Sequence, residues 1–322
     1  MIVIEKTTPL SSVQDLGRTG SLHYGVGTAG VMDPLALQLG NAMLGNVPNA
    51  AAIEIPLFPF QVRFMDDCCF AVTGHDGRVM LDDVMLPFWW SAQARKGQRL
   101  TLHASRRTTR AYLHLPGGVD VPAVLGSRST QLRGEFGGFQ GRGLHQGDRL
   151  YAIEPKQAGP VDFGIMPPWY GLGVADTPVP LIRVLPAAEY GIFTEDSCQA
   201  FWLQAWQITP QSNRYGYRLS GQPLIAKAPL EMRSHGIVPG VIQIPHNGQP
   251  IIQMRDAQPS GGYPKFGTVI DADMWVLGQI PVGSLVRFIQ VSYQQARVAD
   301  AQQQAYLQKV IAQIDCHRRY AG

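Results

Sequence analysis

Two short apolar runs separated by a turn sequence constrain the fold of this chain more than any other feature. Val241–Ile244 and Ile251–Met254 have the length of β-strands and are rich in Ile and Val. Between them stands Asn247-Gly248, the strongest short-range signal for a hairpin, because both central residues of such a turn adopt positive φ. The pattern therefore predicts a β-hairpin over residues 241–254.

Polar side chains crowd this hairpin and the loop that follows it. A structural hairpin needs the Asn-Gly turn and little else. This density of amide, carboxylate and guanidinium groups beside glycines indicates a surface that binds a small polar molecule. The polar residues concerned are Gln243, His246, Asn247, Gln249, Gln253, Arg255, Asp256, Gln258 and Tyr263.

The rest of the chain also favours β-structure. Glycine and proline, 35 and 24 of 322 residues, mark many turns between short segments. Phe60–Phe64 alternates with period two, and similar short runs recur between turn signals, which predicts a barrel or a sandwich. We therefore expect a mainly β chain with some α. The other expected strands are Phe70–Val72, Val79–Leu81, Leu100–Leu102, Ala111–Leu115, Leu181–Leu185, Val269–Asp273 and Leu285–Val291.

Three helices are expected. The first begins after Asp33, a good N-cap followed by proline, and stops at Gly45. Thr194 caps a second helix with acidic residues in its first turn, which suits the macrodipole. The third runs from about Gln294 to Arg319 and carries an apolar stripe on one side.

Length and composition predict two domains in a cytoplasmic protein. At 322 residues the chain can bury more than one core, and a stretch rich in proline and glycine interrupts it. We expect an N-terminal β-rich domain over residues 1–160, a linker over 161–180, and a C-terminal domain with a terminal helix over 181–322. The first residues are typical of a strand and not of a signal peptide.

Several partners and cofactors are disfavoured. The net charge is +3 without a basic stripe, so nucleic acid is not an expected partner. The apolar runs are too short to span a membrane. Cys68 and Cys69 are adjacent, which is neither disulfide nor zinc spacing, and no second Cys or His pair completes a metal site. We therefore expect no bound metal.

Two further segments each have two interpretations. Gln14, Asp15 and Arg18 either present polar side chains to a ligand or form a solvated turn with a local Asp–Arg pair. The glycine-rich basic segment 126–143 either cradles an anion on backbone N–H groups or is a mobile or interface loop. It lacks the Gly-x-x-x-x-Gly-Lys-[Ser/Thr] form of a P-loop, which occurs nowhere in the chain.

The candidate site combines residues whose chemistry suits a cyclic amide. An arginine such as Arg214 holds a carboxylate or phosphate in a bidentate fork. Asp256 could orient a substrate N–H or act as a base, and Tyr263 could stack or donate to an oxyanion. His246 either shuttles a proton or is a structural hydrogen-bonding residue. Amide side chains recognise a lactam, urea or ureido group; those in question are Asn213, Asn247 and Gln258.

Three motifs carry a resemblance to a known family. Gln211–Leu219, Pro239–Pro250 and Gly261–Pro264 resemble the biotin-dependent carboxyltransferase family, also called allophanate hydrolase subunit 2. Ser12–Arg18 and Ala51–Ile55 fit the same family, so the resemblance extends over almost the whole chain. Within the family, the chain looks most like the branch formed by the C subunits of bacterial 5-oxoprolinases.

The resemblance implies a fold, a reaction and partners. The implied architecture is a cyclophilin-like β-barrel. The implied partners are the B subunit of 5-oxoprolinase, itself cyclophilin-like, and the A subunit, a β/α barrel. The implied reaction opens the lactam of 5-oxo-L-proline to L-glutamate with hydrolysis of ATP, which would bind with a partner. Carried over, the catalytic residues are Asp256, Arg214 and Tyr263, and the substrate-binding residues are Asn213, Gln243, Asn247 and Gln258.

Two other functions fit the same residues. The chain could be half of a biotin-dependent carboxyltransferase that acts on urea or a related amide and uses a separate biotin carrier. It could also be a non-catalytic binder that regulates an inhibitor of a kinase. Biotin is a cofactor only in the first of these alternatives.

Overall fold

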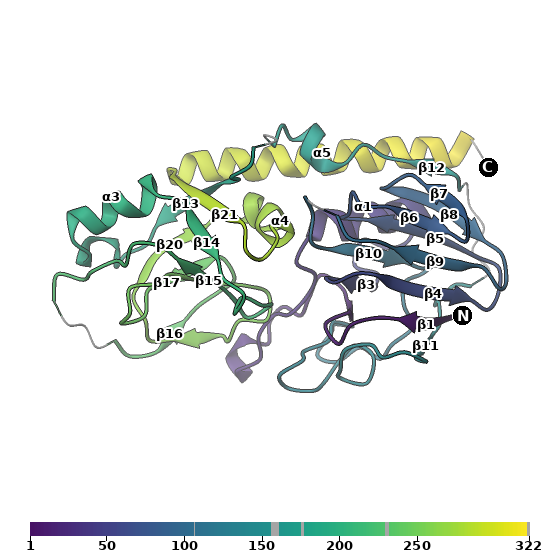
Figure 1. The fold of residues 1–322 in the computed structure, drawn as a ribbon, viewed down its shortest axis with the longest axis horizontal. Helices are drawn as coiled ribbons and strands as arrows, with labels where there is room; N and C mark the ends of the chain where they lie inside the picture. The colour runs from purple at the N-terminus through teal and green to yellow at the C-terminus, as the bar shows by residue number, and fades with distance from the viewer. Residues whose placement is uncertain (106, 156–160, 175–176, 229–231, 321–322) are drawn as a thin grey trace. The chain divides into compact units, whose positions relative to one another are not determined.

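The protein is described by a computed structural model that covers residues 1–105, 107–155, 161–174, 177–228 and 232–320. Contacts divide the chain into two compact units (Figure 1). Unit 1 combines Met1–Arg18, Ala29–Gly173 and Ala305–Gly322, and unit 2 combines Thr19–Thr28 and Val174–Gln304. Residues 175 and 176 of the predicted linker lie outside the described residues. Each unit combines segments that are not consecutive in sequence, whereas the predicted domains are continuous stretches. The predicted domain boundaries therefore stay a prediction.

Unit 1 is built on two six-stranded antiparallel sheets (Figure 1). In spatial order the first contains β11 (Arg149–Leu150), β1 (Ile2–Lys6), β4 (Phe60–Phe64), β9 (Arg99–Leu102), β6 (Val79–Leu81) and β7 (Val84–Leu86). The second contains β12 (Phe163–Gly164), β8 (Trp90–Ala94), β5 (Cys68–Thr73), β10 (Ala111–His114), β3 (Ala52–Ile55) and β2 (Ser12–Gln14).

The two sheets share one hydrophobic core. In β4, Phe60, Val62 and Phe64 are fully buried while the residues between them are half-buried, as the period of two predicts. Side chains from both sheets belong to the same cluster, among them Val62 of β4 and Phe70 of β5. Unit 1 is therefore a β-sandwich, one of the two architectures expected from the sequence.

Helix α1 (Pro34–Leu44) confirms the predicted caps. The side chain of Asp33 accepts a hydrogen bond from the backbone N–H of Ala36 at 2.9 Å, and Gly45 ends the helix at φ 73°. The last turns of the C-terminal helix α5 (Tyr293–Tyr320) pack on α1 through Ile314, and Arg318 donates to the backbone oxygen of Met43 at 2.9 Å.

The loop after β2 is buried, so the interpretation of a solvated turn is wrong. The carboxylate of Asp15 accepts hydrogen bonds of 2.6 Å from the hydroxyls of Ser127 and Ser129 and from the backbone N–H of Arg128. Arg18 is 1% exposed and donates to the backbone oxygen of Ser129 at 2.6 Å. The start of the glycine-rich segment 126–143 thus holds an anion that belongs to the chain itself, the carboxylate of Asp15.

Unit 2 is built on a closed barrel of seven strands (Figure 1). All neighbouring pairs are antiparallel except the first and last strands in sequence, which pair in parallel and close the barrel. The predicted mainly β fold with a β-barrel is therefore confirmed. In spatial order the strands are β13 (Leu181–Pro186), β20 (Lys265–Val269), β17 (Val241–Gln243), β18 (Ile251–Gln253), β15 (Gly216–Ser220), β14 (Trp206–Ile208) and β21 (Leu285–Gln290).

Shorter elements complete the two units. Phe201 of α3 (Glu195–Leu203) contacts Phe266 and Phe288 of the barrel, with ring centroids 4.3 and 4.9 Å apart. A two-stranded ribbon, β16 (His235–Gly236) with β19 (Ser260–Gly261), is formed by the segments that precede and follow the β17–β18 hairpin in sequence. The remaining elements are α2 (Pro168–Gly171), α3 (Glu195–Leu203), α4 (Asp271–Gln279), η1 (Leu22–Tyr24) and η2 (Tyr190–Ile192).

Two local predictions need correction. The strand expected over Val269–Asp273 is wrong, because β20 ends at Val269 and α4 begins at Asp271. Most of α4 is buried all round, so it lacks the one-sided apolar periodicity that marks a helix in sequence. The hairpin of β17 and β18 is confirmed. Its turn differs, because Gly248 alone has positive φ and its N–H donates to the oxygen of Pro245 at 2.9 Å.

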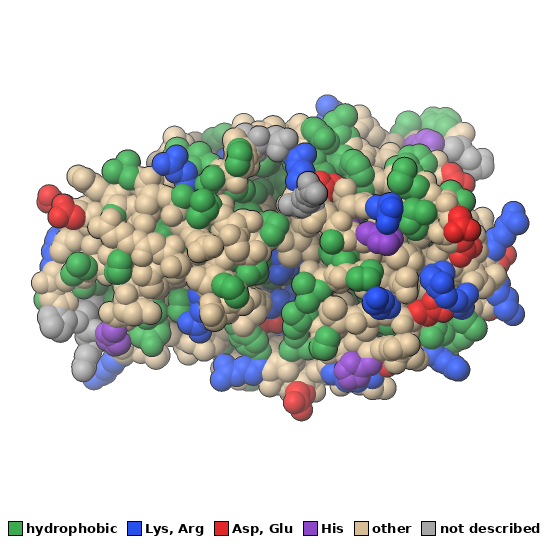
Figure 2. Space-filling view, viewed as in Figure 1, with side chains coloured by type: hydrophobic (Ala, Val, Ile, Leu, Met, Phe, Trp, Pro, Cys, Tyr) green, Lys and Arg blue, Asp and Glu red, His purple; other side chains and the backbone are tan. Residues whose placement is uncertain are grey.

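Surface composition agrees with the low charge of the chain. On the face shown in Figure 2, Lys and Arg side chains stand singly or in small groups among polar and apolar ones. Among the described residues, no helix has the length and apolar character needed to cross a membrane.

Candidate functional site

The candidate site lies on the outer face of the barrel, on β17, β18 and β20. Ile242 and Ile252 pair across the hairpin and are fully buried in the barrel interior. Because side chains alternate along a strand, Gln243 and Gln253 project to the opposite face. They are nevertheless only 2% and 7% exposed, so this polar face is covered. The next strand adds Lys265, which is paired with Gln243 in the register of β17 and β20.

A chain of amide hydrogen bonds runs along this face. Gln253 Nε2 donates to Gln243 Oε1 at 3.0 Å, and Gln243 Nε2 donates to the backbone oxygen of Tyr263 at 3.3 Å. Gly261 of the ribbon lies directly above Gln243, since a Cβ on Gly261 would stand 2.6 Å from Gln243 Nε2. The ribbon can approach this closely only because position 261 has no side chain.

Arg214 and Asp256 form a buried ion pair. The guanidinium donates from Nε and Nη2 to the two carboxylate oxygens, at 2.9 and 2.8 Å. The backbone N–H of Asp256 also donates to the backbone oxygen of Arg214 at 2.8 Å. The sequence predicts both residues for the site but does not show that they bind each other. Any contact of Asp256 with a substrate N–H therefore competes with a bidentate arginine fork.

Asn213 and Asn247 stabilise local turns. Asn213 Oδ1 accepts from the backbone N–H of Tyr215 at 2.8 Å, and Asn247 Oδ1 accepts from that of Gln249 at 3.1 Å. Both are Asx-type turns, which leave the amide nitrogen of each side chain available. Gln258 is exposed, in the loop between β18 and β19.

Tyr263 and His246 lie next to each other at the edge of this face. Their rings meet edge to face with centroids 5.9 Å apart, and Tyr263 is 42% exposed. A ligand approaching the amide chain from solvent would meet these two side chains. The structure thus brings Gln243, Tyr263 and His246 close together and joins Arg214 to Asp256 in a separate pair.

A cluster of Glu189, His235 and Lys265 beside the amide chain is not apparent from the sequence. The ammonium of Lys265 contacts Nε2 of His235. Glu189 Oε2 accepts from the backbone N–H of Lys265 at 3.2 Å, and its Oε1 is 4.0 Å from His235 Nε2. The three residues are far apart in sequence and none belongs to a spaced motif. The only signal was the position of Lys265 directly after the Gly261–Pro264 loop.

No metal centre accompanies this cluster in the described residues. Among those residues, no group of three or more His, Cys, Asp or Glu side chains is arranged to hold a metal ion. The four cysteines are free, and burial raises the pKa of the Cys68 thiol to about 11.

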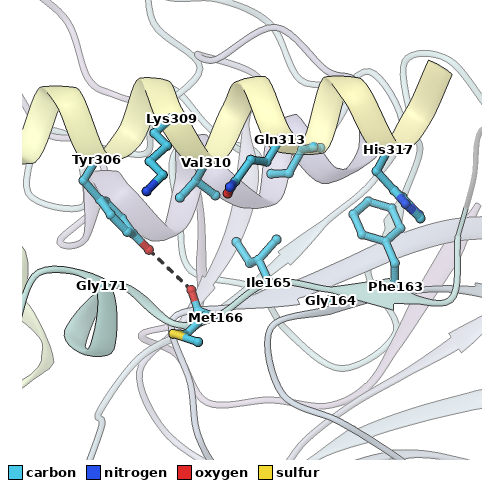
Figure 3. A pocket seen from close by; sticks show the side chains of 11 residues that line it. Phe163, Gly164, Ile165, Met166, Gly171, Tyr306, Lys309, Val310, Gln313 and His317 are labelled. Atoms are coloured by element: carbon cyan, nitrogen blue, oxygen red, sulfur yellow. Dashed lines mark hydrogen bonds between the residues drawn. The ribbon is translucent and has the colours of Figure 1, made fainter. Parts of the chain in front are cut away.

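Unit 1 has a hollow of its own that contains none of the predicted site residues (Figure 3). It measures about 530 Å³ and lies between α5 and the segment around β12. Tyr306 closes one end by donating to the backbone oxygen of Met166 at 3.3 Å, and burial raises the pKa of its phenol to about 12. Most other lining side chains are apolar, with Lys309, Gln313 and His317 projecting from α5.

The barrel is that of a carboxyltransferase domain. The family of the carboxyltransferase domain, subdomains A and B, matches residues 24–290, so the chain belongs to this family. Within it, the chain is 42% identical over 310 residues to the C subunit of 5-oxoprolinase from Escherichia coli K12, which covers 96% of this chain and 97% of that protein. The C subunit from Haemophilus influenzae is 40% identical over 318 residues, covering 98% and 99%. The predicted family is confirmed.

A solved structure agrees with the sequence relatives. The urea amidolyase of Kluyveromyces lactis superposes with a TM-score of 0.87 at 28% sequence identity, over 96% of this chain. The chain spans only 20% of the length of that enzyme. The same fold therefore occurs as a separate polypeptide in the bacterial relatives and as a segment of a much larger protein.

Proposed function

We propose that the chain is the C subunit of an ATP-dependent 5-oxoprolinase, which opens 5-oxo-L-proline to L-glutamate together with the B and A subunits. The identity of 40–42% to two such C subunits, over nearly the full length of each, carries this proposal. The free cysteines and the need for ATP favour the cytoplasm.

The amide-rich face suits a lactam. A lactam presents one carbonyl acceptor and one N–H donor, and a carboxamide offers two donors and two acceptor lone pairs. A hydrogen bond between Gln243 and Gln253 fixes the orientation of their carboxamides, which would bind the carbonyl and the N–H of the lactam. Asn213, Asn247 and Gln258 would contribute further contacts from the surrounding loops, and Tyr263 would donate from the solvent side.

Arg214 and Asp256 are proposed to act as a unit. The pair is pre-formed and buried, so it holds the Asn213 loop and the loop after β18 in fixed positions. A guanidinium beside the reacting carbonyl would stabilise negative charge that develops on its oxygen. Asp256 keeps that guanidinium oriented.

The described residues of the barrel do not fit ATP. The chain has no P-loop sequence, and Arg214 is engaged by Asp256. We therefore assign nucleotide binding to a partner, and we derive no chemical step on the nucleotide in this chain.

Reconstitution tests the proposal. The purified chain is mixed with the B and A subunits, ATP and 5-oxo-L-proline, and glutamate is measured. We expect glutamate release that requires all three proteins and ATP. Turnover that is unchanged when this chain is left out contradicts the proposal.

The structural likeness to urea amidolyase favours a second candidate, half of a biotin-dependent carboxyltransferase. In that case the chain, its partner and a biotinylated carrier would carboxylate urea or a related amide, and 5-oxo-L-proline would give no glutamate. Tight binding to the partner without either reaction would indicate the regulatory binder.

A further inference from the structure

Lys265 is an unusual residue for a barrel strand. It is the first residue of β20 and only 9% exposed, although lysine is rarely buried unless it is paired. Its ammonium contacts the ring of His235, which is the first residue of β16. The lysine therefore lies between the barrel and the covering ribbon.

The hydrogen-bond partners define the protonation of this contact. His235 Nδ1 is 3.0 Å from the backbone oxygen of Arg233, which can only accept, so Nδ1 carries the proton. In the neutral imidazole, Nε2 is then an acceptor and receives a hydrogen bond from the Lys265 ammonium. Lys265 is thus the donor and His235 the acceptor of this hydrogen bond.

No anion contacts the ammonium of Lys265 within the part of the chain that the structure describes. Among those residues, no carboxylate lies within 4.0 Å of the Lys265 ammonium, and Glu189 bonds to the backbone N–H of Lys265 instead. A buried ammonium with a neutral acceptor as its partner is stabilised further by any small anion that reaches it. His235 is the group that such an anion would displace, and its side chain is 40% exposed.

The ammonium of Lys265 lies at one end of the chain of amide hydrogen bonds. Lys265 is paired with Gln243 at a β-bulge between β17 and β20, and Gln253 follows on the next strand. A ligand that binds both the ammonium of Lys265 and the carboxamides of Gln243 and Gln253 needs a carboxylate next to an amide. In 5-oxo-L-proline the carboxylate is attached to the ring carbon that is bonded to the lactam nitrogen.

We propose that Lys265 binds the carboxylate of a small lactam acid, displacing His235, while Gln243 and Gln253 bind the lactam group. This inference rests on the proposed function, because it identifies the residue that would select an acidic lactam over a neutral one. It adds a specificity-determining residue that lies outside the motifs carrying the family resemblance.

The experiment compares Lys265→Met with Lys227→Met in the reconstituted complex. Lys227 is an exposed lysine of the same unit that donates to the backbone oxygen of Gly191, so it controls for loss of a lysine charge. We expect Lys265→Met to lower kcat/KM for 5-oxo-L-proline by roughly 10- to 100-fold, mostly through KM, as for loss of a charged hydrogen bond. The kcat/KM of Lys227→Met for 5-oxo-L-proline is expected to stay within about twofold of the wild-type value.

A second ligand separates recognition of the carboxylate from damage to the fold. 2-Pyrrolidone has the same lactam ring without the carboxylate and is tested as a competitive inhibitor. We expect its inhibition constant to be the same for wild type and Lys265→Met. Equal weakening of both ligands, or unchanged kcat/KM for 5-oxo-L-proline, overturns the inference and leaves the proposed function standing.

Failure of the proposed function gives a different result. If the wild-type complex releases no glutamate, calorimetry on the complex still measures binding of 5-oxo-L-proline and of 2-pyrrolidone to wild type and to Lys265→Met. The inference is supported if Lys265→Met loses binding of 5-oxo-L-proline but keeps binding of 2-pyrrolidone, while wild type binds both. Absence of binding to wild type, or displacement of the acid by inorganic phosphate at lower concentration than the acid itself needs, overturns it.

Discussion

Arg214 and Asp256 hold each other through two parallel hydrogen bonds of 2.9 and 2.8 Å in a site where neither side chain reaches solvent appreciably. A third bond joins their backbones, since the N–H of Asp256 donates to the oxygen of Arg214. The loop before β15 and the loop after β18 are therefore fixed to each other. Substitutions at this pair must be designed to separate stability from turnover.

Asp256→Ala is expected to destabilise the chain as well as stop turnover. The substitution removes the carboxylate that accepts two hydrogen bonds from a buried guanidinium, which costs about 3–5 kcal/mol in comparable cases. The double variant Arg214→Met, Asp256→Leu removes both charges and is expected to regain most of the stability, but not the activity. Urea denaturation and glutamate release by the reconstituted complex measure the two effects. A double variant with wild-type turnover would remove both residues from the proposed catalytic set.

The two glycines of the ribbon provide a matched pair of substitutions. A Cβ on Gly261 would stand 2.6 Å from Gln243 Nε2, whereas a Cβ on Gly236 would meet nothing within 4 Å. We expect Gly261→Ala to lower the free energy of unfolding by about 1–3 kcal/mol, as in other overpacked sites, and to raise KM. Gly236→Ala is expected to be neutral for both. Similar behaviour of the two variants would show that the ribbon does not rest on the amide chain.

His114 makes the stability of unit 1 depend on pH. Burial lowers the pKa of this histidine from 6.5 to about 3, and its ring nitrogens contact Thr73 and Asn41. Above pH 6.5 the ring is neutral in both folded and unfolded chains, so its contribution is fully present. As the pH falls from 6.5 towards 3, only the unfolded chain takes up the proton, and stability is lost.

Between pH 8 and pH 5 this loss amounts to about 2 kcal/mol from His114 alone. His114→Gln is expected to be less stable at pH 8 but to lose less stability between the two pH values. Urea midpoints of wild type and variant at pH 8 and pH 5 give the difference. Equal losses in the two proteins would assign the pH dependence to other groups.

Asp15 is expected to be essential for the ordered path of the glycine-rich segment. Its carboxylate accepts hydrogen bonds from two serine hydroxyls and from the backbone N–H of Gly17 and Arg128. Asp15→Ala leaves these donors unsatisfied and should cost roughly 3 kcal/mol or more. Ser127→Ala removes one partner and should cost about 1 kcal/mol. Limited proteolysis within residues 126–143 reports the change, and equal sensitivity of both variants to protease would contradict it.

Local signals predicted much of the fold. The caps at Asp33 and Gly45, the alternation in Phe60–Phe64 and the hairpin of β17 and β18 depend on neighbours in sequence, and the structure has them all. Helix α4 was missed because it is buried on all sides and its apolar residues follow no clear period. Burial of Asp15 depends on serines more than a hundred residues away, which no local pattern shows.

The candidate site was predictable by residue type and not by partnership. Polar density identified Gln243, Asp256 and Tyr263, but the sequence did not show that Asp256 is bound to Arg214. Lys265 was missed because it precedes a phenylalanine in an ordinary strand, and only the ribbon that covers it makes it buried. Residues 175 and 176 of the predicted linker lie outside the described residues, so that part stays a prediction.

The parallel pairing of β13 with β21 determines when the barrel can be completed during synthesis. β13 begins at Leu181 and its partner ends at Gln290, with every other barrel strand between them in sequence. A nascent chain shorter than this therefore carries two unpaired strand edges, on β13 and on β14, and such edges recruit other chains. Fragments that stop before Leu285 are expected to aggregate. Unit 2 is protected from association with other chains only after β21 has been synthesised.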